Sequence, residues 1–596
     1  MERPQPVRTR DIGARTGPPP RPRTEADLRF IRQRAVRWFS PGTLAGAGLR
    51  VLISSAFGAY LDKRELQASI GAEPLARGVD IPELWIDYVS DTGDGFDATY
   101  TIAWLVAQES LSAPGLPVPL PRGDVLVLGG DEVYPAGDAE EYENRFVGPY
   151  RASLPWTDGG SPEMYALGGN HDWYDGLTSF IRIFCQEKWL GGRKTRQTRS
   201  YFALQLPHRW WLWGIDIQFD AYIDEPQLRY FEKATKLMQP GDRVILATAK
   251  PSWVDLKADP GAFRNLAYVE RRLIEPTGAR LMLTVSGDSH HYAHYVAADG
   301  THKVTAGGGG AFLHPTHDLD DDIEIQVDPA DDRTRRPYAL TACYPEKRAS
   351  RRLAWGAIGL PLRNPSFMVV PAVLYALLGW SSQFSLRAFE LPGPLEESAP
   401  AFGWLDLWLG LARNPISILL VLIALAAWIA FAKPPVKWAQ NPQRLIAKVV
   451  MGSLHTALHL VAVVLVGLLA VRFADLLADR GWFTFWFLVG MGVFGGVAGG
   501  LITGGYLALC NVIPGLDAHG NETFSAQRLT GYKNFLRMRL DSHGVLHVYP
   551  FGVRRVLKNR QWRLDPDGPP GAPWIGPEDD PPRAHLIEPP FTVDGR

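Results

Sequence analysis

The segment MYALGGNHD (residues 164–172) decides how the fold of this chain is interpreted. Its residues 164–167 are apolar and predict a short buried strand. The turn that follows carries Asn170, His171 and Asp172, which offer an amide oxygen, an imidazole and a carboxylate. Because such side chains bind hard and borderline metal ions, the segment predicts a metal-binding turn at the end of a strand.

Similar turns follow other apolar runs between residues 84 and 310. Runs at residues 84–89, 125–128, 164–167, 210–215, 243–247 and 281–285 predict buried strands with helices between several of them, which indicates an α/β class. Asp91 follows the first run, Asp131 and Tyr134 follow the second, and Asp288 and His290 follow the last. An aspartate in a glycine-containing turn is often only a turn former. Four such turns in order, however, favour side chains that converge on a pair of cations about 3.5–4 Å apart.

The order of these motifs resembles the calcineurin-like metallophosphoesterase superfamily over residues 84–315. The matching residues are Asp91, Gly130-Asp131, Gly169-Asn170-His171-Asp172 and Gly287-x-x-His290. The resemblance implies a four-layer αββα sandwich of two mixed sheets flanked by helices. It also implies a two-metal site in which metal-bound hydroxide hydrolyses a phosphoester.

The resemblance further implies a role for each matched side chain. Asp91 and His290 would bind the first metal ion, and Asp131 would bridge both ions. Asn170 would bind the second ion and help to hold the phosphate. His171 would lie beside the leaving group as an acid or electrostatic stabiliser.

The chain departs from the usual superfamily pattern at its first turn. Asp91-Thr92-Gly93 stands where Asp-x-His is usual, and Gly130-Asp131-x-x-Tyr134 matches the variant found in purple acid phosphatases. In that branch a tyrosinate replaces the histidine, so Tyr134 would bind an Fe(III) ion. The alternative is that Tyr134 packs beside Pro135.

The second metal ion has a weaker set of ligands. Lys250 stands where superfamily members offer a histidine, and Asp288 stands where they offer another. A protonated lysine is no ordinary ligand, whereas Asp288 is a hard oxygen donor. One metal site would then be retained with an altered metal preference and the other weakened. The alternative is that Lys250 replaces the charge of the cation and contacts phosphate directly, and Lys250 joins His171 and Asp172 as a predicted catalytic residue. The predicted cofactor is two divalent or mixed-valence transition-metal ions (Mn, Fe or Zn), with occupancy of the second site left open.

Four segments of near-spanning length contain no Asp, Glu, Lys or Arg. They cover residues 366–384, 415–432, 449–471 and 481–513, and the last three meet the length of about 20 residues that a spanning helix needs. The first is weaker because it contains Pro371, and its alternative is a buried or re-entrant helix. We therefore expect an α-helical membrane bundle of about four spans.

The loops favour one orientation of this bundle. Basic residues cluster before the first segment, between the second and third, and after the fourth, whereas the other two loops carry fewer. The amino-terminal catalytic domain and the carboxyl tail should then both be cytoplasmic. Within the third segment, His455 and His459 share one helix face, where a hydrogen bond between helices is favoured over a metal site.

These features divide the chain into five parts. A disordered Arg- and Pro-rich tail (residues 1–25) is followed by a metallophosphoesterase domain (26–345), a basic juxtamembrane linker (346–365), the membrane domain (366–513) and a carboxyl-terminal tail (514–596). In the last part, residues 521–539 indicate an amphipathic helix, residues 545–556 indicate one or two strands, and the remainder should be loose. Residues 307–310 are all glycine and form either a flexible turn or a segment beside the site.

Charge and cysteine content narrow the range of functions. With 62 basic and 63 acidic residues the formal net charge is -1, so no nucleic-acid partner is expected. The three cysteines are too few for a disulfide framework. We expect a membrane-anchored phosphohydrolase, with membrane lipids as partners and a lipid-linked substrate and a homo-oligomer left open. The alternative is a sensor or scaffold whose degenerate phosphoesterase domain binds a phosphorylated ligand.

Overall fold

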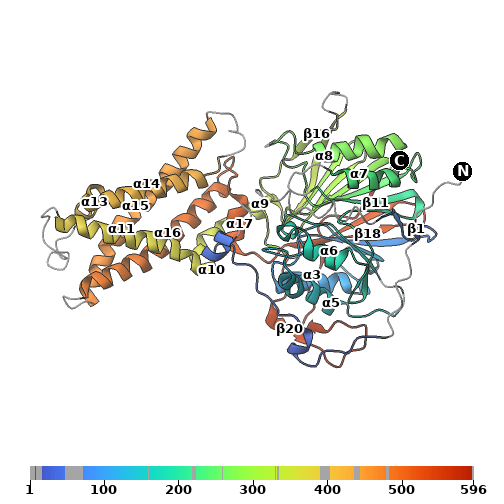
Figure 1. Cartoon of the computed structure of the whole chain (residues 1–596), viewed down its shortest axis with the longest axis horizontal. Helices are drawn as coiled ribbons and strands as arrows, with labels where there is room; N and C mark the ends of the chain where they lie inside the picture. Colours follow the sequence, from blue (N-terminus) through green and yellow to red (C-terminus); the bar gives the residue numbers. More distant parts are fainter. Residues whose placement is uncertain are drawn as a thin grey trace. The chain divides into compact units, whose positions relative to one another are not determined.

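A computed structural model describes residues 7–8, 17–46, 71–158, 160, 162–217, 223–257, 259–328, 331, 334–388, 403–434, 443–477 and 482–593. The chain forms two compact units. The sheet unit comprises Met1–Val36, Ala47–Lys347 and Leu529–Arg596, and the helical unit comprises Arg37–Gly46 and Arg348–Arg528 (Figure 1). The helical unit is therefore inserted into the chain of the sheet unit.

The larger sheet of the sheet unit has ten strands in mixed order. In spatial order these are β1 (Val7–Arg8), β2 (Leu75–Ala76), β10 (Phe202–Gln205), β11 (Trp210–Ile215), β12 (Arg243–Thr248), β13 (Arg280–Ser286), β15 (His302–Ala306), β14 (Tyr292–Ala297), β17 (Arg335–Tyr344) and β16 (Asp322–Gln326). Strands β11, β12, β13 and β15 pair in parallel. Antiparallel pairs adjoin them on both sides, and β1 and β2 extend the sheet beyond β10 in parallel. The carboxyl ends of β12 and β13 therefore lie at the same edge.

The second sheet has nine strands, four of which come from residues 533–593. Its order is β22 (His585–Leu586), β19 (Leu546–Val553), β18 (Lys533–Leu540), β3 (Leu84–Val89), β6 (Val125–Leu128), β7 (Glu163–Ala166), β9 (Arg193–Thr195) and β8 (Trp189–Leu190), with β23 (Phe591–Val593) paired to β19. Strands β3, β6 and β7 are parallel, and β18 runs antiparallel to β3. The start of β18 consequently lies beside the carboxyl end of β3. Two small hairpins pair β4 (Ser110–Leu111) with β5 (Leu120–Pro121) and β20 (Trp562–Leu564) with β21 (Ile575–Pro577).

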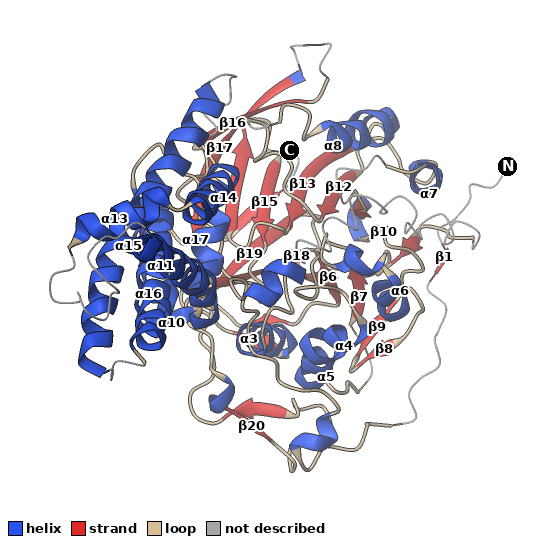
Figure 2. Ribbon diagram, turned by 60° about the vertical axis from the view of Figure 1, so that its left-hand side comes forward, coloured by secondary structure: helices blue, strands red, loops and turns tan. Residues whose placement is uncertain are grey.

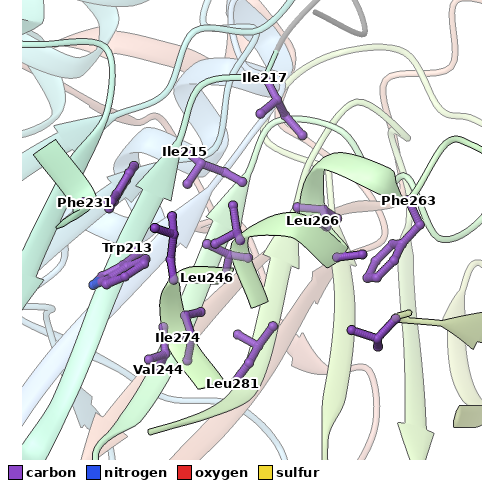
Figure 3. Packing of buried hydrophobic residues seen from close by; sticks show 14 of the residues in the cluster. Trp213, Ile215, Ile217, Phe231, Val244, Leu246, Phe263, Leu266, Ile274 and Leu281 are labelled. Carbon is purple, nitrogen blue, oxygen red and sulfur yellow. The ribbon is translucent and has the colours of Figure 1, made fainter. Parts of the chain in front are cut away.

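Helices cover the outer face of each sheet (Figure 2). Helices α3 (Phe96–Ala107), α4 (Ala139–Tyr142), α5 (Gly148–Ser153) and α6 (Thr178–Phe184) pack on the nine-stranded sheet, and α7 (Glu225–Thr235) and α8 (Arg264–Tyr268) pack on the ten-stranded sheet. Figure 3 shows the core between the ten-stranded sheet and its helices, where Trp213 and Leu246 of the sheet share one buried cluster with Phe231 and Leu266 of the helices. A third buried cluster, which includes Tyr88, fills the space between the sheets.

The αββα four-layer prediction is therefore confirmed. Every residue of β3 and of β6 is buried, because these strands have a sheet or helix layer on both faces. This arrangement explains why their sequences are nearly continuous apolar runs instead of alternating ones.

The helical unit follows the expected helical pattern. It contains α9 (Lys347–Ala354, most of which belongs to this unit), α10 (Leu360–Arg363), α11 (Val369–Ala388), α13 (Trp404–Arg413), α14 (Pro415–Phe431), α15 (Gln443–Leu477), α16 (Phe483–Val512) and α17 (Gly520–Gln527). Helix α16 approaches α11 closely, since a Cβ at Gly495 would lie 2.6 Å from the Cβ of Tyr375. The Tyr375 hydroxyl is 3.0 Å from His459 Nδ1, which confirms the predicted hydrogen bond between helices.

Three of the described helices are long and apolar enough to cross a membrane: Pro365–Gln383, Gln443–Leu477 and Phe483–Val512. A fourth candidate is the pair α13 and α14, which passes the test together but is bent by 87°. This reverses part of the expectation. The first segment, thought weaker because of Pro371, qualifies alone, whereas residues 415–432 form a helix of only 17 residues that needs α13. Parts of the loops used to predict orientation (389–402, 435–442 and 478–481) lie outside the described residues.

The structure also divides the chain differently from the five expected parts. Residues from Leu529 onward belong to the sheet unit and are not a separate tail. The predicted helix at residues 521–539 ends at Gln527, and strand β18 follows it. The later residues form a strand because successive side chains of β18 point alternately into the buried clusters on the two faces of the sheet. The strand expected within residues 545–556 is confirmed as β19.

The two chain ends are more ordered than predicted where the structure describes them. The Arg21 guanidinium donates hydrogen bonds to the carbonyls of Asp565, Pro569, Ala572 and Pro573, so this part of the predicted disordered tail is bound. Residues 1–6 and 9–16 of that tail lie outside the described residues.

Candidate metal centre

Three predicted metal-binding aspartates follow strands directly and share an unusual backbone conformation. Asp91 comes after β3, Asp131 after β6 and Asp288 after β13, with φ angles of 58°, 52° and 62°. Such positive angles are uncommon for residues other than glycine and cost roughly 1–3 kcal/mol each. The turns are interlocked, because Asp91 N–H donates to Gly130 O at 2.9 Å and Asp288 N–H donates to Asp91 Oδ2 at 3.0 Å. The surrounding structure thus holds these three residues in conformations that they would not adopt on their own.

Side chains from three separate turns meet at the hydroxyl of Tyr134. This oxygen lies 3.1 Å from Asp91 Oδ1, 3.2 Å from Asp131 Oδ2 and 3.0 Å from His290 Nε2. All four side chains are buried. The structure therefore brings together four of the six predicted metal ligands, and Asp288 joins them through its backbone N–H.

The orientation of His290 is set by its other ring nitrogen. His290 Nδ1 lies 2.8 Å from the carbonyl oxygen of Phe312 and donates to it. Nε2 is then an acceptor that faces Tyr134 and Asp91. A histidine held in this way through a backbone carbonyl is the usual arrangement for a metal ligand.

When Asp91 and Asp131 are ionised, this cluster has more acceptors than protons, even though Asp288 N–H also reaches Asp91 Oδ1 at 3.1 Å. One phenolic hydrogen of Tyr134 faces two carboxylate oxygens and an imidazole nitrogen that has already used its other N–H. A cation would satisfy all three acceptors, so the chemistry of the donor set fits one hard or borderline metal ion held by Asp91, Asp131, Tyr134 and His290. Among the described residues, however, no group of three or more His, Cys, Asp and Glu side chains is arranged to hold a metal ion.

The pKa values of the buried groups also fit a bound cation. Burial, and then the charge of Asp288, raise the pKa of Asp91 well above its usual value. Burial, followed by the charges of Asp172 and Asp91, does the same to the pKa of Asp131. The pKa of His290 is instead lowered well below its usual range, first by burial and then by the charges of His314 and Lys533. A bound cation would favour the ionised carboxylates and the neutral imidazole.

The Asn170-His171-Asp172 turn is attached to this cluster. His171 N–H donates to Asp131 Oδ1 at 2.9 Å, and His171 Nδ1 lies 2.9 Å from Pro135 O, with its ring 4.4 Å from that of Tyr134. Asn170 is half-buried beside it. The turn is thus held against Asp131 and Tyr134.

Asp172 has a different position from the one that a catalytic role needs. Its carboxylate is fully buried and accepts from Tyr142 Oη at 2.6 Å, Gly169 N at 2.8 Å and Glu132 N at 3.3 Å. Both oxygens are therefore occupied by protein donors, so Asp172 positions the turn. Tyr142, which the sequence analysis missed, is its partner from α4.

Lys250 lies at the rim of the same region. It follows β12 by two residues, and its neighbour Ala249 would be 3.0 Å from a Cβ at Gly130. Its ammonium group is 3.0 Å from Asp255 Oδ2, and the side chain is half-buried. The geometry thus places Lys250 near the site but pairs its charge with Asp255, which the sequence analysis did not anticipate.

The glycine segment at residues 307–310 lies beside the side chains of the candidate metal centre. A Cβ at Gly307 would be 2.7 Å from Asp91 Oδ2, and one at Gly308 would be 2.1 Å from Asn534 Nδ2. Of the two alternatives, a flexible turn and a segment beside the site, the second is correct. Lys533 and Asn534 at the start of β18 also adjoin this segment. The sequence analysis missed them because they lie far along the chain from the other site residues, after the helical unit, and no nearby motif indicates their position.

Comparisons with known proteins give little further guidance. No family model and no curated protein sequence matches the chain. A purple acid phosphatase isolated from yellow lupin (Lupinus luteus) seeds has a partial structural likeness, with 12% identity and a TM-score of 0.28. The match covers 39% of this chain and 45% of that chain. The function is therefore argued from the geometry of the site itself.

Proposed function

We propose that the sheet unit is a metal-dependent phosphoesterase that hydrolyses a phosphoester with a metal-activated water. One observation carries this proposal: Asp91, Asp131 and Asp288 hold left-handed conformations after three strands, and two of them meet at Tyr134 together with His290. Backbone strain of this kind persists only where surrounding contacts impose it, and it clusters at functional sites.

Each residue of the site would have a separate role in the proposed hydrolysis. A bound transition-metal pair would supply an activated water and polarise the phosphate oxygens. Asp91, Tyr134 and His290 would hold the first ion, Asp131 would bridge, and Asn170 would contact the second ion and the phosphate. His171, whose ring is oriented by Pro135 O, would protonate or stabilise the leaving oxygen.

The sheet pairing supports an even number of membrane crossings. Strand β3 precedes the helical unit, β18 follows it, and the two pair in one sheet. Both strands have to lie on one side of the membrane, which favours an even number of crossings and so supports the bent pair α13–α14 as a fourth span beside the three long helices. The excess of basic residues in the flanking segments favours the cytoplasm as that side.

Cysteine accessibility in intact cells tests this topology. Gly403→Cys and Trp482→Cys should react with an impermeant reagent, whereas Lys433→Cys should not. Equal labelling at positions 403 and 433 would show that the bent pair does not cross.

The activity is tested first through metal content. Detergent-purified full-length protein should contain about two transition-metal ions per chain and should hydrolyse a chromogenic phosphoester. Asp131→Asn should lose both properties, while Asp579→Asn, a substitution of an exposed aspartate, should keep them. The compounds tested as substrates should then include lipid phosphates, because the same chain contains candidate membrane spans.

One observation favours the alternative function. Lys250, at the position where a histidine ligand would be expected, has its charge paired with Asp255. A sensor or scaffold that binds a phosphorylated ligand without turnover would contain one ion or none. Unchanged metal content in Asp131→Asn would favour this reading.

A further inference from the structure

Residues that follow the helical unit brace the glycine segment of the candidate site. Asn534 N–H donates to Gly308 O at 3.1 Å, and Leu313 N–H donates to Leu529 O at 3.3 Å. Between these two contacts, the ammonium group of Lys533 donates to the carbonyl of Ala311. Residues 308–313 are thus held at three points by the first six residues of the chain after the helical unit.

The braced segment in turn contacts the metal ligands. Ala311 N–H donates to Asp91 O at 2.9 Å, and Gly309 N–H donates to Ser90 O at 2.8 Å. The next carbonyl, Phe312 O, is the acceptor that sets the ring of His290. A displacement of the segment would therefore reach both Asp91 and His290.

Lys533 is an unusual residue for this position. Its side chain is completely buried, so the chain has to bury a cation to make one hydrogen bond to a carbonyl. Burial lowers the pKa of Lys533 to about 8, while Asp94 and Asp91 act in the opposite direction. A buried charge can often be replaced by an apolar side chain of similar volume without loss of stability. Packing alone thus gives no reason for a lysine here.

We propose that Lys533 is a positioning residue for the first metal ion: it holds Ala311 so that Phe312 O orients His290 Nε2 toward Asp91 and Tyr134. This role rests on the proposed function, because it concerns the ligands of the same site. It also means that the site is completed by chain on the far side of the helical insertion.

The direct test replaces Lys533 with a neutral side chain of similar size. Lys533→Met in full-length protein should weaken Mn²⁺ or Zn²⁺ binding by about 10- to 100-fold, the effect typical of lost contacts behind a metal ligand. The matched control is Lys303→Met. Lys303 is also buried in the sheet unit, but its ammonium group lies 4.9 Å from the ring centre of Phe263 and 5.2 Å from that of Tyr338, among aromatic side chains instead of beside the ligands. This control should bind metal as tightly as the unmodified protein.

A double-mutant cycle distinguishes positioning from a general loss of structure. If Lys533 acts through His290, adding Lys533→Met to His290→Asn should cost little further affinity. Additive losses would overturn the proposal, as would equal losses in Lys533→Met and Lys303→Met.

Hydrogen exchange of the metal-free proteins separates this inference from the proposed function. Lys533→Met should speed exchange of the Gly309 and Ala311 amides, and Lys303→Met should leave them unchanged. If the unmodified protein binds no metal, the proposed function fails, but faster exchange confined to Lys533→Met would still support the brace. Unchanged exchange in Lys533→Met would refute it.

Discussion

The two halves of the candidate site differ in how firmly they are held. In the first half, Asp91, Tyr134 and His290 are buried and bonded to one another, and residues of β18 brace the segment behind them. In the second half, Asn170 and Lys250 are half-buried, and the charge of Lys250 is paired with Asp255. The side chains of the first half are already oriented before an ion binds, whereas those of the second half would have to be oriented by the bound ion or phosphate. The difference predicts that the two ions bind with unequal affinity.

The largest expected effect comes from breaking the strand that supports the first half. Arg537 of β18 and Asp87 of β3 form a buried ion pair with N–O distances of 2.7 and 3.0 Å. Arg537→Met leaves the buried carboxylate without its partner, which should cost about 3–5 kcal/mol of unfolding free energy. Chemical denaturation measures this loss. Arg583→Met removes an exposed pair with Asp580 and should change stability by at most about 0.5 kcal/mol. Equal effects would mean that β18 does not support the site.

The next largest effect separates the two halves by their metal ligands. Tyr134→Phe removes the hydroxyl oxygen at the centre of the first half. The affinity for the first ion should therefore fall more than the about 10- to 100-fold loss that is typical when a residue behind a metal ligand is replaced. With Fe(III) bound, the visible charge-transfer band should disappear. Tyr549→Phe, on β19 beside Trp85, should retain the band. If the charge-transfer band persisted in Tyr134→Phe, Tyr134 would not be a metal ligand, and the alternative that it only packs beside Pro135 would be favoured.

A smaller effect should appear on strengthening the second half. Lys250→His supplies a neutral ligand in place of a cation, so the affinity for the second ion should rise, and the variant should retain this ion at lower free-metal concentrations than the unmodified protein. Elemental analysis checks this. The control is Lys257→His, because Lys257 also pairs with an aspartate, Asp320, on the surface. No change at position 250 would place Lys250 outside the site.

The smallest effect concerns the metal-free protein. The pKa of Asp131 is raised in the folded state, so the folded protein binds more protons than the unfolded one and loses stability as pH rises above the ordinary aspartate value. Asp131→Asn should remove this penalty and raise the Tm of the metal-free protein by a few degrees at neutral pH, with little gain at acidic pH. Thermal scans across pH test the sign. A lower Tm at neutral pH would show that the hydrogen bonds to Asp131 outweigh its buried charge.

The sequence predicted those parts of the site in which ligands lie close to their own strand. Asp91, Asp131 and His290 were predicted from turns after apolar runs, because a buried strand and the turn that ends it are both local features. Asp172 was assigned to catalysis since its residue type fits, yet its hydrogen bonds make it a support. Only the positions of Tyr142 and Gly169 reveal that difference.

By itself, the sequence determined the α/β class, the turns that carry Asp91, Asp131 and His290, and the apolar segments, because each depends on residues within one strand, turn or helix. Tertiary structure alone decided that residues after the helical unit complete the sheet and brace His290. Arg537 and Asp87 are 450 positions apart, and Lys533 and Ala311 are 222 apart. Strand pairing over such separations is set by the burial of both faces in a common core, and no local pattern records the partner.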